Sequence, residues 1–305
     1  MIKPTPYLVL SLLCLSCLGI QTAVAQTAVN GLPEVKEVRG TIVMPALSNL
    51  KVTTLGNKAM DVRTFESLLQ GKTYPGYADL VVKSNKPVVL VGSMRPGTAM
   101  SADGPLNLYR AVILAGSKDA VGKGVMVMLN DTINAGREVT KTITDRVDTF
   151  QAPIIGALGV FTGDQPVFYR KSLRKNTTET EFDVTNLTTL PRVDIVYHYA
   201  GNAGTMIDAA VNADAKGIVH AGTGDGSIGK QEYPAVENAL KKGVVIVRSA
   251  RVGSGIIARN GEADDDKYGF IASDNLNPQK ARVLLMLALT KTTDVKEIQR
   301  MFWEY

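Results

Sequence analysis

The sequence predicts an α/β fold with two domains, a larger N-terminal doubly wound sheet and a smaller C-terminal parallel sheet. Two observations lead to this prediction. Short, continuous runs of branched apolar residues alternate with amphipathic helical segments, as in parallel sheets that are covered on both faces. The chain also has 305 residues, of which 45% are hydrophobic, and this is enough for more than one core.

Residues 1–25 are predicted to be a signal peptide and not part of either domain. Lys3 gives a basic start, Leu8–Ile20 an apolar stretch and Ala23–Ala25 a small-residue cleavage site. The apolar stretch is too short to span a bilayer. We therefore expect export to the periplasm, with cleavage before Gln26.

Both cysteines, Cys14 and Cys17, lie inside the predicted leader. The remaining chain therefore has no disulfide, no thiol nucleophile and no cysteine-ligated zinc. Of the 34 basic residues only Lys3 is in the leader, so 33 remain against 29 acidic residues. These charges are interspersed, which indicates neither a nucleic-acid partner nor a membrane surface.

The N-terminal domain is predicted to span residues 26–170, with one interruption. Its first elements are a strand near 38–43, a strand at 50–55 and an amphipathic helix at 60–69. Glycines and a proline then break the pattern around 71–80, where a doubly wound sheet needs another strand and a full helix. We infer that an internal segment is missing there.

The pattern resumes at a buried strand, and every later element follows from apolar runs, helical periodicity and turn residues. In the N-terminal domain we expect strands at 88–91 and 125–129, a helix at 104–115, a polar loop at 130–144 and a hairpin over 156–169. A threonine-rich linker at 171–191 leads to the C-terminal domain, 192–305. There we expect strands at 193–197, 217–219, 244–247 and 268–272, and helices at 205–213, 232–240, 278–290 and 294–302.

The sequence lacks the motifs of several common enzyme classes. The two histidines, His198 and His220, both fall at the ends of predicted strands, and we interpret them as structural. There is no serine-hydrolase elbow, no zinc-protease motif and no cluster of metal ligands in the sequence. No cofactor is expected.

A glycine-rich loop, GTGDGSIGK at 222–230, leaves more than one interpretation open. Gly224 and Gly229-Lys230 approximate a phosphate-binding loop, although Gln231 stands where a serine or threonine would hold magnesium. A nucleotide-binding α/β protein is therefore one hypothesis. A tight turn that needs glycine only for its geometry is another.

Longer stretches carry a resemblance to a known family. They are KPVVLVGSMRPGTAMSADGPLNLY at 86–109, VVIVRSARV at 244–252, NLNPQKARVLL at 275–285 and RMFWEY at 300–305. In these stretches the chain closely resembles the bacterial type II L-asparaginases, and especially their glutaminase-asparaginase branch. The resemblance implies hydrolysis of L-asparagine and L-glutamine to the acids and ammonia, without a cofactor. It also implies a homotetramer of intimate dimers that share active sites.

The resemblance assigns roles to three residues in recognisable motifs. Ser227 lies in AGTGDGS, which matches the family's AGxGNGS except that Asp225 replaces asparagine, and with Glu262 it is implied to hold the substrate's α-ammonium group. Lys141 lies in GREVTKT, which matches GRDVTKT. It is implied to help activate a threonine, since a lysine desolvated beside a carboxylate can relay the hydroxyl proton.

The other motifs depart from the family pattern. Thr41 aligns with the attacking threonine of TGGTIA, but Arg39 replaces a glycine there. Asn57 and Lys58 replace the serine and glutamine of the substrate-carboxylate loop GSQDM, and HGTDT is absent from the sequence. Because losing one member of a catalytic set costs orders of magnitude, we predict impaired activity. The alternative is a non-catalytic remnant or an amino-acid-binding pseudoenzyme.

Overall fold

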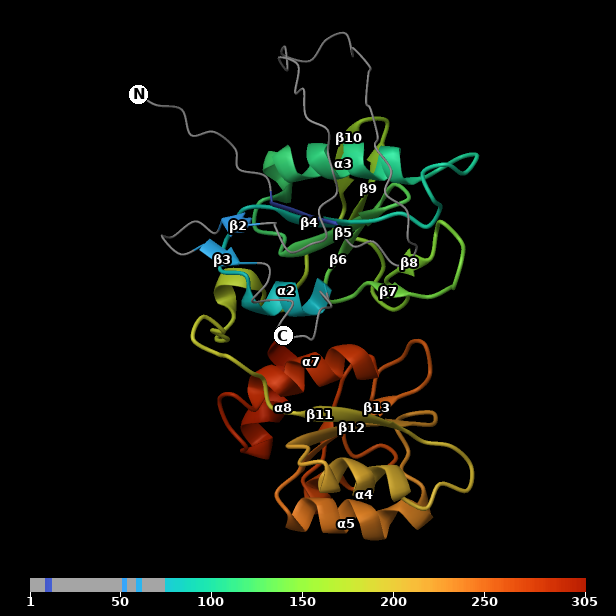
Figure 1. Cartoon of the computed structure of the whole chain (residues 1–305), viewed down its shortest axis with the longest axis vertical. Coiled ribbons are helices and arrows are strands. Elements are labelled where there is room, and N and C mark those ends of the chain that lie inside the picture. The colour runs from blue at the N-terminus through green and yellow to red at the C-terminus, as the bar shows by residue number, and fades with distance from the viewer. Residues whose placement is uncertain (1–8, 13–50, 54–58, 62–74) are drawn as a thin grey trace.

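A computed structural model describes residues 9–12, 51–53, 59–61 and 75–305. Two sheets lie one above the other in Figure 1, and helices α2 (Pro75–Val81) and α7 (Pro278–Ala288) pack between them. The larger N-terminal domain and smaller C-terminal domain confirm the predicted fold class.

The N-terminal sheet has six strands; the first three pair in parallel, and each later pair of neighbours is antiparallel. In order across the sheet they are β1 (Val9–Leu12), β4 (Val88–Val91), β5 (Val125–Leu129), β6 (Thr132–Ala135), β9 (Gly159–Thr162) and β10 (Gln165–Phe168). The expected hairpin is confirmed as β9–β10. The expected polar loop at 130–144 is wrong in part, because Asn130 and Asp131 take positive φ angles and turn the chain straight back into β6.

Strand β4 shows how the sheet is covered on both faces. Its side chains alternate, so Val88 and Leu90 pack with α2 and α7, whereas Val89 and Val91 pack with α3 (Gly104–Gly116). A continuous apolar run therefore forms a strand with two buried faces, as predicted.

The chain before residue 75 contributes short pieces. Strand β1 falls inside the predicted signal peptide and forms the edge of the sheet beside β4, so removal of a leader would expose the β4 edge. Strands β2 (Lys51–Thr53) and β3 (Ala59–Asp61) pair antiparallel. Strand β3 occupies the start of the helix expected at 60–69, whose remainder lies outside the described residues, as does the strand expected near 38–43.

The C-terminal sheet is wholly parallel. Its order is β11 (Val193–Tyr197), β12 (Gly217–Gly222), β13 (Val245–Ala250) and β14 (Ile271–Ala272). Helices α4 (Thr205–Asn212) and α5 (Tyr233–Lys241) cover one face, and α7 and α8 (Val295–Glu304) cover the other (Figure 1). Strand β14 is shorter than expected because α6 (Asp265–Tyr268) precedes it and ends at Gly269 in the left-handed region.

The remaining elements are short. They are the 3₁₀ helices η2 (Lys118–Ala120), η3 (Thr177–Glu179) and η4 (Lys230–Glu232), and the paired strands β7 (Thr140–Lys141) and β8 (Phe150–Gln151). Within the predicted linker 171–191, Phe182 and Val184 are buried in the same core cluster as α7. This segment therefore packs against the domains that it connects.

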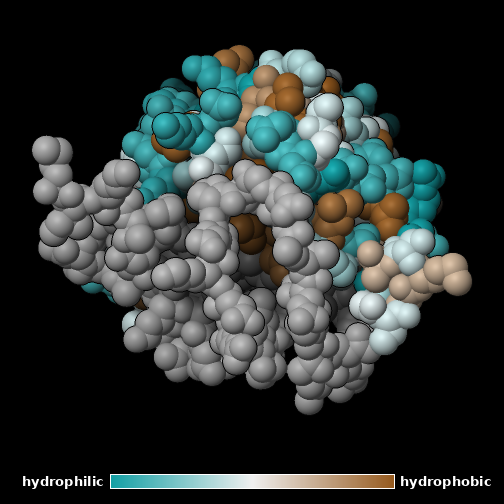
Figure 2. Space-filling model, turned by 90° about the horizontal axis from the view of Figure 1, so that it is seen from above, coloured by the Kyte–Doolittle hydropathy of each residue, from teal (hydrophilic) through white to brown (hydrophobic). Residues whose placement is uncertain are grey.

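Seen from above in Figure 2, the described surface is mainly hydrophilic and its apolar residues form separate small groups. In the part of the chain that the structure describes, no helix combines the length and the apolar character that crossing a bilayer requires.

Candidate active site

The loop after β4 is organised by two polar side chains. The Asp103 carboxylate accepts backbone N–H bonds from Met94 at 2.9 Å and from Arg95 at 2.9 Å. The Asn107 side chain donates to Asp103 at 3.1 Å and to the Gly92 carbonyl at 3.0 Å. The aspartate and asparagine of MSADG and NLY therefore hold the end of the strand in shape.

Of the four predicted N-terminal site residues, the structure describes only Lys141. Thr41, Asn57 and Lys58 lie outside the described residues. Lys141 lies in β7 with an exposed side chain, and no hydrogen bond or ion pair joins its ammonium to another described residue. The desolvated lysine beside a carboxylate that proton relay needs is therefore not formed by the described part of one chain.

The two predicted C-terminal site residues are brought together. The Ser227 hydroxyl donates to a carboxylate oxygen of Glu262 at 3.1 Å, although the residues are 35 positions apart. The turn that presents Ser227 needs its first glycine, because a Cβ on Gly222 would lie 2.4 Å from the Ser227 carbonyl oxygen.

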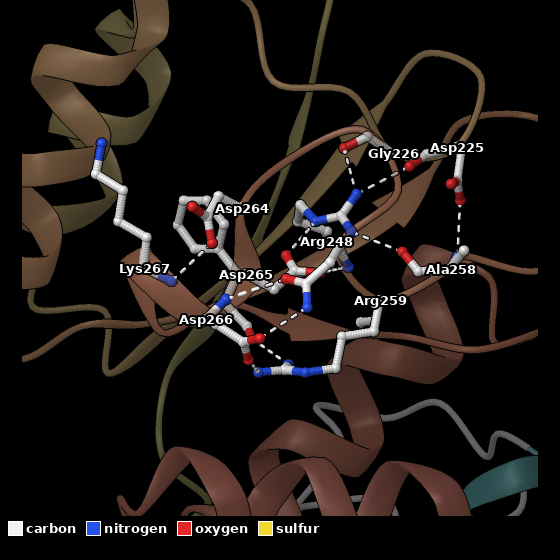
Figure 3. A network of polar contacts seen from close by, with 12 residues as sticks. Asp225, Gly226, Arg248, Ala258, Arg259, Asp264, Asp265, Asp266 and Lys267 are labelled. Carbon is white, nitrogen blue, oxygen red and sulfur yellow. Dashed lines mark hydrogen bonds and ion pairs between the residues drawn. The ribbon is translucent and has the colours of Figure 1, made fainter.

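A buried arginine holds the two loops that carry this pair (Figure 3). The Arg248 guanidinium is fully buried and donates to both carboxylate oxygens of Asp265, at 2.6 and 2.7 Å. It also donates to the carbonyl of Asp225 in the glycine-rich loop and to that of Ala258, each at 2.9 Å. One planar, fork-shaped cation thus joins strand β13 to both loops.

Asp225, which stands where the family has asparagine, adds a second connection. One of its carboxylate oxygens accepts the Ala258 N–H at 2.8 Å (Figure 3). The other would lie 2.3 Å from a Cβ on Gly261, so any larger residue at that position would push the Asp225 carboxylate aside. The carboxylate therefore ties the glycine-rich loop to the segment that leads into Glu262.

The same loop is poorly suited to phosphate. A phosphate loop offers free backbone N–H groups to the anion, but the Ser227 N–H donates to the Thr223 carbonyl and the Gly229 N–H donates to the Glu232 carboxylate at 2.8 Å. A phosphate placed there would meet a negative charge. The geometry thus argues against the nucleotide hypothesis.

A cavity of about 60 Å³ lies between the domains near this loop. Thr140 and Pro153 line it from the N-terminal domain, and Gly224 and Val252 line it from the C-terminal domain. Pockets that enclose a whole small-molecule ligand measure roughly 300 Å³ or more. The described part of one chain therefore does not enclose an amino acid in this cavity.

Sequence reasoning did not single out Arg248 or Asp265. The one signal that could have identified Arg248 is a charged residue inside the apolar run VVIVRSARV, because a buried charge requires a partner. Nothing in the sequence indicates which of the acidic residues is that partner.

These features describe a two-domain α/β protein whose C-terminal loops carry a serine and glutamate pair at the carboxyl ends of parallel strands. The family model described as "Asparaginase, N-terminal" matches residues 76–174. The model described as "Glutaminase/Asparaginase C-terminal domain" matches residues 192–302. The chain therefore belongs to the asparaginase/glutaminase family of amidohydrolases, as its motifs predicted.

Three relatives show the extent of the likeness. The chain is 43% identical to a glutaminase-asparaginase of Pseudomonas fluorescens biotype A, covering 94% of this chain and 82% of the relative. It is 51% identical to L-asparaginase 2 of Bacillus subtilis, over 75% of this chain and 60% of the relative. It is 48% identical to a probable periplasmic L-asparaginase of Haemophilus influenzae, over 75% of this chain and 66% of the relative. The chain thus spans less than two thirds of the latter two proteins.

Proposed function

We propose that this chain hydrolyses the side-chain amide of L-asparagine and L-glutamine, releasing ammonia and the corresponding acid, with impaired turnover. The observation that carries the proposal is the Ser227–Glu262 pair, which two separate loops bring within 3.1 Å of each other. The names of the relatives, which include both glutaminase-asparaginase and L-asparaginase, support the two substrates.

In the proposed reaction the Thr41 hydroxyl attacks the amide carbon and its proton leaves toward a relay that includes Lys141. The relay passes that proton to the amide nitrogen, which leaves as ammonia, and water then cleaves the acyl-enzyme to release the acid. Ser227 and Glu262 hold the α-ammonium group, and the proposed ligands of the α-carboxylate are Asn57 and Lys58. None of these steps needs a cofactor.

Impaired turnover has two supports. Arg39 replaces a glycine two positions before Thr41, where we expect a side chain to crowd the approach of substrate, and the HGTDT motif is absent from the sequence. Lys141 is exposed and has no carboxylate partner among the described residues. Because the members of a catalytic set act as a unit, losing one lowers kcat by several orders of magnitude.

A second candidate function is amino-acid binding without turnover. It is favoured by the location of the Ser227–Glu262 pair, which C-terminal residues build and hold by themselves. Titration calorimetry with L-aspartate separates a binding protein from an inert remnant, because only the binding protein releases or absorbs heat. Asn57 and Lys58 would contribute to this binding.

We further propose a periplasmic homo-oligomer, a tetramer by family resemblance, that binds small molecules and neither nucleic acid nor membrane. The Haemophilus influenzae relative, a probable periplasmic L-asparaginase, supports the location. The small size of the cavity in one chain supports a site completed by a second chain. Light scattering after gel filtration measures the assembly, and a monomer that still binds L-aspartate would contradict a shared site.

The hydrolase proposal is tested by ammonia release from L-asparagine and L-glutamine at high protein concentration. Thr41→Ala should abolish the release, whereas Thr162→Ala, at an exposed hairpin position, should not change it. If the unmodified chain releases no ammonia, or if Thr41→Ala retains full release, the hydrolase proposal or its nucleophile is wrong.

A further inference from the structure

The two histidines of the chain meet at one buried carboxylate. His198 follows strand β11, His220 lies in β12, and Glu232 ends η4 at the start of α5. His198 Nδ1 lies 2.6 Å from one Glu232 oxygen, and His220 Nε2 lies 3.1 Å from the other. In the sequence the three residues are 12 to 34 positions apart, and nothing there marks Glu232 as their meeting point.

The carboxylate accepts hydrogen bonds from two further donors. The Asn202 amide donates to one oxygen at 2.6 Å, and the Gly229 N–H donates to the other at 2.8 Å. With the two imidazoles, each carboxylate oxygen of Glu232 thus has two polar partners, the arrangement that an ionised carboxylate accepts. The group is therefore an oriented anion in the interior.

This anion lacks a permanent positive partner. Glu232 is fully buried, and among the described residues no lysine or arginine forms an ion pair with it. A buried charge is costly unless it is paired or binds a metal. The compensating charge must therefore be a proton on an imidazole or a bound cation.

One ring nitrogen is also unused. His220 Nδ1 is buried and has no hydrogen-bond partner, so this ring is not held from both sides. The His198 side chain is 15% exposed, so one member of the cluster reaches the surface. The cluster is therefore not fully satisfied by protein groups and lies next to solvent at His198.

We propose that His198, His220 and Glu232 form a binding site for a divalent transition-metal ion of the zinc class. The three ligand atoms lie within 4.8 Å of one another. Zinc bonds of about 2.0–2.2 Å to nitrogen and oxygen place ligand atoms roughly 3.4 Å apart, so the most distant pair has to approach by at most about 1.4 Å. Two imidazoles and a carboxylate are a donor set that zinc favours, and water takes the fourth position.

The surrounding contacts suit this role. Asn202 and Gly229 donate to the carboxylate and keep it oriented while the metal binds, as outer ligands do in metalloproteins. Metal displaces the hydrogens that now lie between the imidazoles and the carboxylate, so acid should weaken binding. Because Gly229 belongs to the glycine-rich loop, the ion ties β11 and β12 to that loop. The site does not depend on amide hydrolysis.

The test uses full-length protein without a polyhistidine tag and with Cys14→Ser and Cys17→Ser, since those cysteines could bind zinc themselves. Equilibrium dialysis with zinc chloride, read by elemental analysis, should give one zinc per chain. Cobalt(II) should give the intense visible absorption of a four-coordinate site. His198→Ala and Glu232→Gln should each weaken binding about 100-fold or more, whereas Glu237→Gln, an exposed acid on α5, should not.

A second measurement needs no substitution in the cluster. The chain has only two histidines, so its imidazole NMR signals report on this site alone. Zinc should shift both sets of signals and raise the melting temperature. The proposal is wrong if zinc at about 0.1 mM moves neither signal, or if the metal still binds with equal affinity in both cluster variants. Ammonia release plays no part in either readout.

Discussion

The two domains use the carboxyl ends of their strands differently. In the C-terminal domain, polar side chains from β12, β13 and the following loops are already paired with one another, with Ser227 on Glu262 and Arg248 on Asp265. In the N-terminal domain, the Asp103 carboxylate is occupied by backbone N–H groups, and Lys141 is exposed without a described partner. The part proposed to hold the substrate is thus assembled within one chain.

The difference extends to the sheets. The C-terminal sheet is parallel throughout, so its strand ends meet at one edge and their loops can pack together. The N-terminal sheet becomes antiparallel after β5, so only part of it presents strand ends at that edge. Four predictions test how far this contrast determines stability and binding.

The largest expected effect is that of Arg248→Ala. It leaves the Asp265 carboxylate buried without its cation and should lower the free energy of unfolding by about 3–5 kcal/mol. Urea denaturation measures the loss. Arg192→Ala is the matched control, because that arginine pairs with Asp194 at the surface and should cost about 1 kcal/mol or less.

The double variant Arg248→Met with Asp265→Leu distinguishes the effect of an unpaired buried charge from a general failure to fold. It removes both charges and should recover part of the stability that Arg248→Ala loses. A similar loss in Arg248→Ala and Arg192→Ala would show that the buried network does not hold the C-terminal loops.

Gly222→Ala should cost about 1–3 kcal/mol of unfolding free energy, because its Cβ would press on the Ser227 backbone at 2.4 Å. It should also weaken L-aspartate binding by displacing Ser227. Gly253→Ala is the control, since a Cβ there meets nothing within 4 Å. Denaturation and calorimetry of both variants give the comparison, and equal values would contradict the need for a tight turn.

The contact between the domains should make stability depend on pH. Burial is the main cause that raises the pKa of Asp79 from 3.8 to about 7, and burial also lowers the pKa of Lys280 from 10.5 to about 7. From pH 4 to 7 the folded chain keeps a proton on Asp79 that the unfolded chain has lost, so rising pH lowers stability. Above pH 7 Lys280 has lost its proton in the folded chain but keeps it in the unfolded chain, so rising pH then raises stability.

Each of the two groups should change the free energy of unfolding by up to about 1.4 kcal/mol per pH unit. Asp79→Asn should remove the pH dependence of stability between pH 4 and 7. The asparagine retains an oxygen that can accept the Val125 N–H. Urea denaturation at pH 5, 6 and 7 measures it, with Asp119→Asn at an exposed position as the control. Parallel pH profiles for the unmodified chain and Asp79→Asn would refute the assignment.

The smallest expected effect is that of Ser227→Ala. One hydrogen bond of about 1 kcal/mol should be lost from the bound amino acid, so affinity for L-aspartate should fall about fivefold in calorimetry. Stability should change by less than about 0.5 kcal/mol, because the side chain is not buried. Ser117→Ala removes a hydroxyl that accepts the Asp119 N–H elsewhere, and it should leave affinity unchanged.

The sequence alone was sufficient for elements that depend on local patterns. The strands at 88–91, 125–129 and 193–197 have the bounds that the structure shows, because their apolar residues are contiguous and turn residues flank them. The family could likewise be read from short motifs. Ser227 and Glu262 were predicted as site residues this way, and the structure shows a hydrogen bond between them.

Only the tertiary structure decided which distant residues meet. The turn at Asn130 and Asp131 and the short strand β6 escaped the pattern because their residues look like a polar loop. The partners of Arg248 and of the two histidines lie 17, 34 and 12 positions away, and no local signal marks them. Local propensity fixes where strands and helices form, but the pairing of buried charges depends on how those elements pack in three dimensions.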